Sequence, residues 1–181
     1  LVGRDVFNNR LDSTFQISRE NIFGGGKTVD AFAGLHSYYN HGNQPNLHIS
    51  WLFNFSGKPY LSQKWVRAIC NEFYGTECIH GYGYGQDEDQ GQLGAWYVMS
   101  ALGLFDVKGL TQTNPTFQIG SPMFDKVTIK LNKKYYPGNE FVIETKNNAK
   151  DNFYIQSINL KGKPYNSVQL PYSEFVKGGR M

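Results

Sequence analysis

Cysteine is scarce in this chain of 181 residues, which has two, at positions 70 and 78. Two cysteines are too few for a disulfide framework, and no second Cys or His pair stands at the spacing of a zinc site. Two interpretations of the pair stay open: one local disulfide between Cys70 and Cys78, or two free thiols.

Long apolar runs are also missing. No stretch reaches the roughly 20 residues that a membrane-spanning helix needs, and no signal peptide or targeting motif is visible. Charged residues make up 18% of the chain, and the lysines form no basic stripe interleaved with aromatics. We therefore expect neither a nucleic acid nor a membrane as a partner. Because the chain opens in mid-pattern at Leu1, we expect an excerpt from a longer polypeptide.

Aromatic residues are abundant at 15% of the chain, and apolar residues reach 40%. Such a composition is typical of a folded chain with one sizeable core or two small domains. In the first part, apolar residues recur at three- and four-residue steps, which predicts amphipathic helices joined by turns. These predicted helices cover residues 5–15, 47–55, 63–73 and 93–102, the last ended by Gly103.

After Gly103 the pattern changes to short runs separated by prolines. Val127, Ile129 and Leu131 alternate with polar residues, as in a half-buried strand, and further strand signals lie at 141–143 and 153–155. The predicted fold class is therefore mixed. A mainly α-helical-hairpin array occupies residues 1–113, and a β-rich segment follows at residues 114–181.

Three consecutive acids, Asp87, Glu88 and Asp89, lie between a glycine-rich loop and the helix predicted at 93–102. Asp89 with Gln92 resembles a capping box, so helix capping explains one acid. It does not explain three, because mutual repulsion opposes their joint ionisation and a cap needs one oxygen. The ligand spacing of an EF-hand is missing. A functional site is the interpretation that we favour.

A second polar loop precedes a helix at residues 41–46, sequence HGNQPN. Pro45 suits a helix start. For His41 the structural alternative is a histidine whose hydrogen bonds are satisfied within the fold. For Asn43 and Gln44 the alternative is helix capping, and it stays open beside a functional role.

These motifs together carry a family resemblance. Their succession resembles the C-terminal part of glycoside hydrolase family 92, whose members are calcium-dependent, inverting exo-α-mannosidases; the motifs are HGNQP at 41–45, WLFN at 51–54, QDEDQGQ at 86–92, AWYV at 95–98, SALG at 100–103 and IGSP at 119–122. The resemblance implies an N-terminal β-sandwich followed by an (α/α)6 barrel. Residues 1–113 would then be the last part of the barrel, and residues 114–181 a β-rich tail.

The resemblance also implies roles for individual residues. Asp87 and Asp89 would activate water, and which of the two is the base stays open. Glu88 and His41 would bind substrate. Asn43 and Gln44 would be calcium ligands; many members carry Glu where this chain has Gln44, and the lost charge would weaken calcium binding or shift linkage preference.

The general acid of the family belongs to a Glu-Gly-Asn-Ala-Trp type of motif, which this sequence lacks. We therefore expect the acid outside these residues and no mannosidase activity from them alone. The implied partners are a mannose-containing glycan and the remainder of the same polypeptide, and the implied location is secreted or periplasmic. The alternative from another class is a non-catalytic carbohydrate-binding or structural module whose acids only cap a helix.

Overall fold

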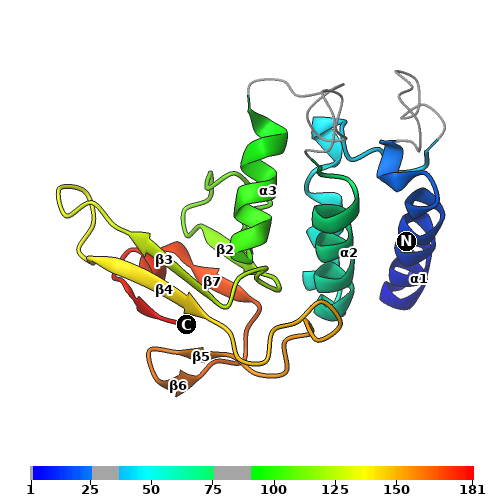
Figure 1. Cartoon of the computed structure of the whole chain (residues 1–181). Coiled ribbons are helices and arrows are strands. Elements are labelled where there is room, and N and C mark those ends of the chain that lie inside the picture. Colours follow the sequence, from blue (N-terminus) through cyan, green and yellow to red (C-terminus); the bar gives the residue numbers. More distant parts are fainter. Residues whose placement is uncertain (1, 26–36, 76–90) are drawn as a thin grey trace. The chain divides into compact units, whose positions relative to one another are not determined.

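The computed structural model describes residues 2–25, 37–75 and 91–181 (Figure 1). Its contacts divide the chain into two compact units, Leu1–Met99 and Ser100–Met181, called here the N-terminal and C-terminal units. Each unit is described by itself. Among the described residues, none of the helices is long and apolar enough to cross a membrane.

Helices form the framework of the N-terminal unit. Helix α1 spans Arg4–Arg19, which confirms the helix predicted at 5–15 and extends it. Helix α2 spans Pro59–Glu72 and begins earlier than predicted, because proline fits the first helical turn. Helix α3 spans Gln92–Leu102 and ends at Gly103, whose φ of +80° favours glycine.

The helix predicted at residues 47–55 is a 3₁₀ helix rather than an α-helix. It is η4, which spans Ile49–Asn54; the shorter 3₁₀ turns η1 and η3 span Ile22–Gly24 and Gln44–Asn46. The buried residues of η4 are Ser50, Trp51, Phe53 and Asn54. Ser50 and Phe53 are three residues apart, as are Trp51 and Asn54, and three residues is the repeat of a 3₁₀ helix. Two sides of the segment therefore face the core.

Aromatic rings fill the core of the N-terminal unit. Phe15 of α1 stacks on Trp65 of α2, with ring centroids 5.4 Å apart. Trp51 and Trp96 are fully buried, which places both in the core. Trp65 also donates a hydrogen bond from Nε1 to Asp12 Oδ1 at 2.7 Å, so its polar atom is satisfied.

Short strands dominate the C-terminal unit. Three antiparallel strands pair in the order β1-β2-β7, and a second sheet has the order β3-β4-β8, with β4 and β8 parallel. The remaining pair, β5 and β6, is antiparallel. The elements are β1 Leu104–Phe105, β2 Thr116–Ile119, β3 Lys126–Lys130, β4 Glu140–Glu144, β5 Asn159–Leu160, β6 Lys163–Pro164, β7 Gln169–Pro171, helix α4 Tyr172–Phe175 and β8 Gly179–Arg180.

The structure tests three predicted strands in this unit. Strands β3 and β4 confirm the predictions around 127–131 and 141–143. The strand predicted at 153–155 is wrong, because the structure has no strand at these residues. The Phe153 and Tyr154 rings instead pack on each other, with centroids 4.6 Å apart.

The end of α3 belongs to the C-terminal unit, so the compact units divide before residue 113. Met123 N donates to Ala101 O and Gly120 N donates to Gly103 O, both at 2.9 Å. A side chain at Gly103 would lie 2.7 Å from the Pro122 ring, so glycine is required there. The assignment of residues 1–113 to a barrel and 114–181 to a tail stays a prediction.

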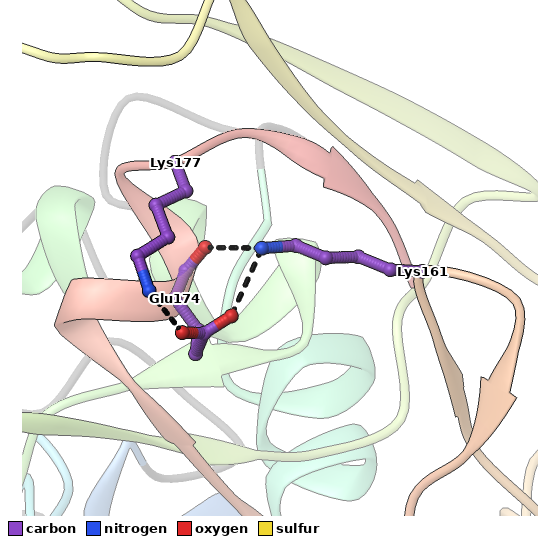
Figure 2. Close-up of polar contacts among 3 residues, drawn as sticks. All are labelled: Lys161, Glu174 and Lys177. Atoms are coloured by element: carbon purple, nitrogen blue, oxygen red, sulfur yellow. Dashed lines mark hydrogen bonds and ion pairs between the residues drawn. The ribbon is translucent and has the colours of Figure 1, made fainter.

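Charged side chains link the last elements of the C-terminal unit at its surface. Figure 2 shows Glu174 of α4 between two lysines: Lys161 Nζ lies 2.9 Å from Oε2, and Lys177 Nζ contacts Oε1. The hydrogen bonds from Lys177 and Lys161 lower the pKa of Glu174 to about 2. Beside them, Gly138 lies so close to the Lys177 backbone that no side chain fits.

Candidate functional site

The three acids predicted as site residues, Asp87, Glu88 and Asp89, lie outside the described residues. The chain on either side of them is described. Helix α2 leads to Tyr74, and helix α3 begins at Gln92 after Gly91, whose φ is +76°. The described part of the candidate site therefore consists of the two segments that flank the acids in the chain, namely the end of α2 and the start of α3.

These two segments are joined by a hydrogen bond. Tyr74 Oη donates to the backbone carbonyl of Leu93 at 3.0 Å. The Tyr74 ring also stacks on Trp96 of α3, with centroids 5.9 Å apart and planes 9° apart. The end of α2 and the first turn of α3 are thus held in contact.

His41 is fully buried next to this junction, and both of its ring nitrogens are hydrogen-bonded. Nδ1 lies 2.8 Å from Tyr39 Oη, and Nε2 lies 2.8 Å from Tyr74 Oη. Because Tyr74 uses its proton on Leu93, the pattern assigns the His41 proton to Nε2, which donates to Tyr74. Nδ1 then accepts from Tyr39.

Aromatic rings enclose the histidine. The ring centroids of Trp96 and Phe73 lie 4.2 and 4.9 Å from that of His41. Burial lowers the pKa of His41 to about 3, so the imidazole is neutral over the range in which enzymes usually work. Burial also raises the pKa of Tyr39 well above its usual range. We call these side chains the His41 cluster: Tyr39, His41, Phe73, Tyr74 and Trp96. The cluster is therefore suited to holding neighbouring segments in place rather than to transferring protons.

The turn at residues 40–47, called here the amide turn, is fixed by hydrogen bonds to backbone carbonyls. His41 N donates to Phe23 O at 2.8 Å, and Asn46 Nδ2 donates to Asn40 O at 3.0 Å. Trp96 Nε1 donates to Leu47 O at 2.8 Å, which joins the turn to α3. The two polar junctions noticed in the sequence are therefore connected in the fold.

Asn43 and Gln44 lie at the start of the 3₁₀ turn η3. Their backbone carbonyls accept hydrogen bonds from Asn46 N at 2.8 Å and Leu47 N at 3.1 Å. Asn43 stands at the N-cap position, yet its side chain makes no capping hydrogen bond. The capping alternative therefore does not describe Asn43, whose side chain is exposed.

The amide turn fits calcium in kind but not in number. Calcium takes six to eight oxygen ligands, carboxylates among them, and Asn43 and Gln44 offer amide oxygens only. Within residues 2–25, 37–75 and 91–181 no group of three His, Cys, Asp or Glu residues is arranged to hold a metal. A calcium ion at the turn would need carboxylates from residues beyond those described.

Sequence reasoning missed Tyr39, Phe73 and Tyr74 as parts of this site. Their contacts join residues far apart along the chain, so periodicity did not reveal them. Two signals were available in the sequence: Tyr39 lies two residues before His41, and Tyr74 lies at the end of an apolar helix. Cys70 is free and buried, and burial raises the pKa of its thiol to about 12, which makes it unreactive. Cys78 lies outside the described residues.

Comparison with known proteins identifies the family. Residues 1–181 match the model of the glycosyl hydrolase family 92 catalytic domain. A curated relative, described as an uncharacterized secreted glycosidase of Arthroderma benhamiae, is 28% identical over 145 residues, which cover 77% of this chain and 17% of the relative.

Solved structures of family 92 enzymes resemble the chain over nearly its whole length. An α-mannosidase from Bacteroides thetaiotaomicron in complex with mannoimidazole matches with a TM-score of 0.76 and 25% identity, over 98% of this chain and 22% of the enzyme. An inverting mannosidase from Bacteroides thetaiotaomicron VPI-5482 matches with a TM-score of 0.72 and 30% identity, over 98% of this chain and 24% of the enzyme. The chain thus spans about a fifth of the length of these relatives.

Proposed function

The chain belongs to glycosyl hydrolase family 92, and we propose that it is part of an inverting, calcium-dependent exo-α-mannosidase that releases terminal mannose from glycans. The observation that carries the proposal is the match of residues 1–181 to the family's catalytic domain. The 30% identity to an enzyme described as an inverting mannosidase supports the stereochemistry.

Asp87 and Asp89 form the water-activating side of the proposed reaction. An inverting glycosidase uses one carboxylate to take a proton from water and one carboxylic acid, roughly 6.5–9.5 Å away, to protonate the leaving oxygen. One of the two aspartates is the base and the other orients it. The acid is a glutamate from the remainder of the polypeptide, which this proposal also makes a partner of the chain.

Glu88 and His41 were expected to bind substrate, and the proposal keeps this contact for Glu88. A carboxylate accepts hydrogen bonds from sugar hydroxyls. His41 instead holds Tyr39 and Tyr74 in place, since both of its ring nitrogens are hydrogen-bonded to these tyrosines and its side chain is fully buried.

Asn43 and Gln44 are the proposed calcium ligands of this chain, through amide or backbone oxygens. A bound calcium would hold two sugar hydroxyls and favour a flattened, oxocarbenium-like ring. The exposed side chain of Asn43, which makes no capping bond, supports this assignment.

The proposal extends to architecture and location. Residues 1–113 are the last part of an (α/α)6 barrel, and residues 114–181 form its β-rich tail. The protein is secreted or periplasmic, as the curated relative's description as a secreted glycosidase supports.

The test of the proposed function uses the intact protein with Asp87→Asn and Asp89→Asn. We expect kcat on an α-mannoside to fall at least about a hundredfold in one of them, because a general base contributes about 10²–10⁴-fold. The exposed Asp151→Asn, which makes the same chemical change elsewhere, is the matched control. Full activity in both single variants and in the double variant would rule out these residues as the base.

Removal of calcium by a chelator should abolish activity, and calcium addition should restore it. Asn43→Ala should raise the calcium concentration needed for half-maximal activity, because an oxygen ligand is lost. Activity and stability that do not change in excess chelator would contradict an essential ion.

A further inference from the structure

Three hydrogen bonds run in one direction through the His41 cluster to the first turn of α3. Tyr39 Oη donates to His41 Nδ1, His41 Nε2 donates to Tyr74 Oη, and Tyr74 Oη donates to Leu93 O, at 2.8, 2.8 and 3.0 Å. Hydrogen bonds in a chain of this kind polarise and strengthen one another in a low-dielectric interior. Loss of any member leaves a buried polar neighbour without its partner.

The last bond in this chain meets α3 where the helix begins. Leu93 is the second residue of α3 and is 1% exposed. The first intrahelical bond runs from Ala95 N to Gly91 O at 2.9 Å. The Tyr74 hydroxyl thus fixes the first turn of α3 against the end of α2.

The same chain of bonds reaches the amide turn. His41 belongs to that turn and donates from its backbone N–H to Phe23 O, and Trp96 of α3 donates to Leu47 O. The start of α3 is therefore tied to the turn through Tyr74–His41 and through Trp96–Leu47. Packing alone would need only apolar side chains here, whereas buried polar groups cost free energy unless every partner is in place.

We propose that Tyr74, held by His41, is a positioning residue that fixes the start of α3 relative to the amide turn for the water-activating step. This inference rests on the proposed function. Asp89 precedes Gly91 by two residues, so a shift of the first turn of α3 moves the attachment point of the acids. A misplacement of about 1 Å at a catalytic group costs on the order of a hundredfold in rate.

Tyr74→Phe tests this role in the intact protein. It removes one hydroxyl and leaves the ring on Trp96. We expect kcat on an α-mannoside to fall about tenfold to a hundredfold with KM changed less than about twofold, because water activation is misplaced while sugar contacts remain. We also expect the amide of Ala95 to exchange with solvent at least about tenfold faster.

The matched control is Tyr165→Phe in the C-terminal unit. Tyr165 Oη also donates to a backbone carbonyl, that of Gln169, at 2.6 Å. Its loss should lower the melting temperature as Tyr74→Phe does and leave kcat and Ala95 exchange unchanged. A fall in kcat of the same size in both variants would mean a merely structural role for Tyr74.

Two further results with Tyr74→Phe would overturn the inference. Unchanged exchange of Ala95 in Tyr74→Phe would show that the hydroxyl does not hold the first turn, whatever reaction the protein catalyses. Faster exchange of Ala95 with unchanged kcat in Tyr74→Phe would show that the hydrogen bond holds the first turn of α3 but does not affect catalysis. Activity retained in Asp87→Asn and Asp89→Asn would count against the proposed function, while the exchange result would stand.

His41→Gln keeps the test decisive if Tyr74→Phe does not fold. Glutamine retains an amide donor for Tyr74 but has a different reach, so we expect a smaller fall in kcat than in His41→Leu, which has no donor. Equal kcat in these two variants would contradict a hydrogen-bonded positioning role.

Discussion

The two units of the chain place their polar groups differently. The buried polar residues of the N-terminal unit include a histidine, an arginine and a glutamine, namely His41, Arg67 and Gln63. In the C-terminal unit the buried polar residues are Ser100, Gln118 and Ser121, and its ion pairs, such as Glu174 with Lys161, are partly exposed.

This difference indicates that the N-terminal unit fixes polar side chains in its interior, whereas the C-terminal unit keeps most of its polar side chains at the surface. Burial of polar groups costs free energy and is tolerated where they hold something in a fixed place. In the N-terminal unit, the His41 cluster joins the end of α2, the start of α3 and the amide turn. In the C-terminal unit, strand pairing and a buried apolar core that includes Phe141 and Leu170 hold the fold, and the surface ion pairs contribute little each.

His41→Leu should affect the stability of the two units most unequally. The change removes the hydrogen bonds of His41 to Tyr39 and Tyr74 and leaves the buried Tyr39 hydroxyl without its acceptor, while Tyr74 keeps its bond to Leu93 O. It should destabilise the N-terminal unit by about 2–4 kcal/mol. Chemical denaturation, followed by hydrogen exchange of peptides from each unit, measures the effect. Phe141→Leu in the C-terminal core, which is also fully buried, is the matched control and should cost less, since no polar group is orphaned. Equal losses would mean that His41 acts by its volume alone.

The pH dependence of stability should separate the units next. The pKa of His41 is about 3 in the fold against 6.5 when unfolded, so the unfolded chain binds a proton that the folded unit excludes. The stability that this contributes is present above pH 6.5 and is lost as the pH falls from 6.5 towards 3, by about 1.4 kcal/mol per pH unit. Peptides of the N-terminal unit should show this slope in hydrogen exchange, and His41→Gln should flatten it. A slope that persists in His41→Gln would assign the effect to another group.

Glu174→Gln should have the smallest effect, confined to the acid side and to the C-terminal unit. Hydrogen bonds from Lys177 and Lys161 lower the pKa of Glu174 to about 2 from 4.5. The contribution is present above pH 4.5 and is lost as the pH falls from 4.5 to 2. Melting temperatures of the two proteins should therefore differ slightly at pH 6 and converge near pH 2. Unequal melting temperatures at pH 2 would show that the substitution acts through something other than the carboxylate charge.

The sequence predicted the elements whose signal is local. Helices α1, α2 and α3 follow from apolar residues at three- and four-residue steps, and Gly103 marks the end of α3 as its positive φ requires. Strands β3 and β4 follow from short β-branched and aromatic runs. The helix predicted at 47–55 is present as the 3₁₀ helix η4, and its type does not follow from the pattern because α and 3₁₀ helices both bury apolar residues over one or two turns. Residues 153–155 have strand propensity but form no strand, because β-propensity is weak against tertiary context.

The sequence marks the motifs of the candidate site but not their arrangement. Residues 41–46 indicate a candidate site because a histidine and amide side chains precede a predicted helix start. That both nitrogens of His41 are occupied depends on Tyr39 and Tyr74, and the link from Trp96 to Leu47 joins distant segments. Contacts of this kind are set by tertiary packing, which the spacing of residues does not encode.

The configuration of the first product tests the proposed inverting mechanism. Proton NMR of the intact protein acting on an α-mannoside, recorded before the released sugar equilibrates, distinguishes the two anomers. Inversion, with water activated opposite the leaving group, predicts that β-mannose appears first and α-mannose grows in later. α-Mannose as the first product would mean retention through a covalent intermediate and would contradict the proposed role of Asp87 and Asp89.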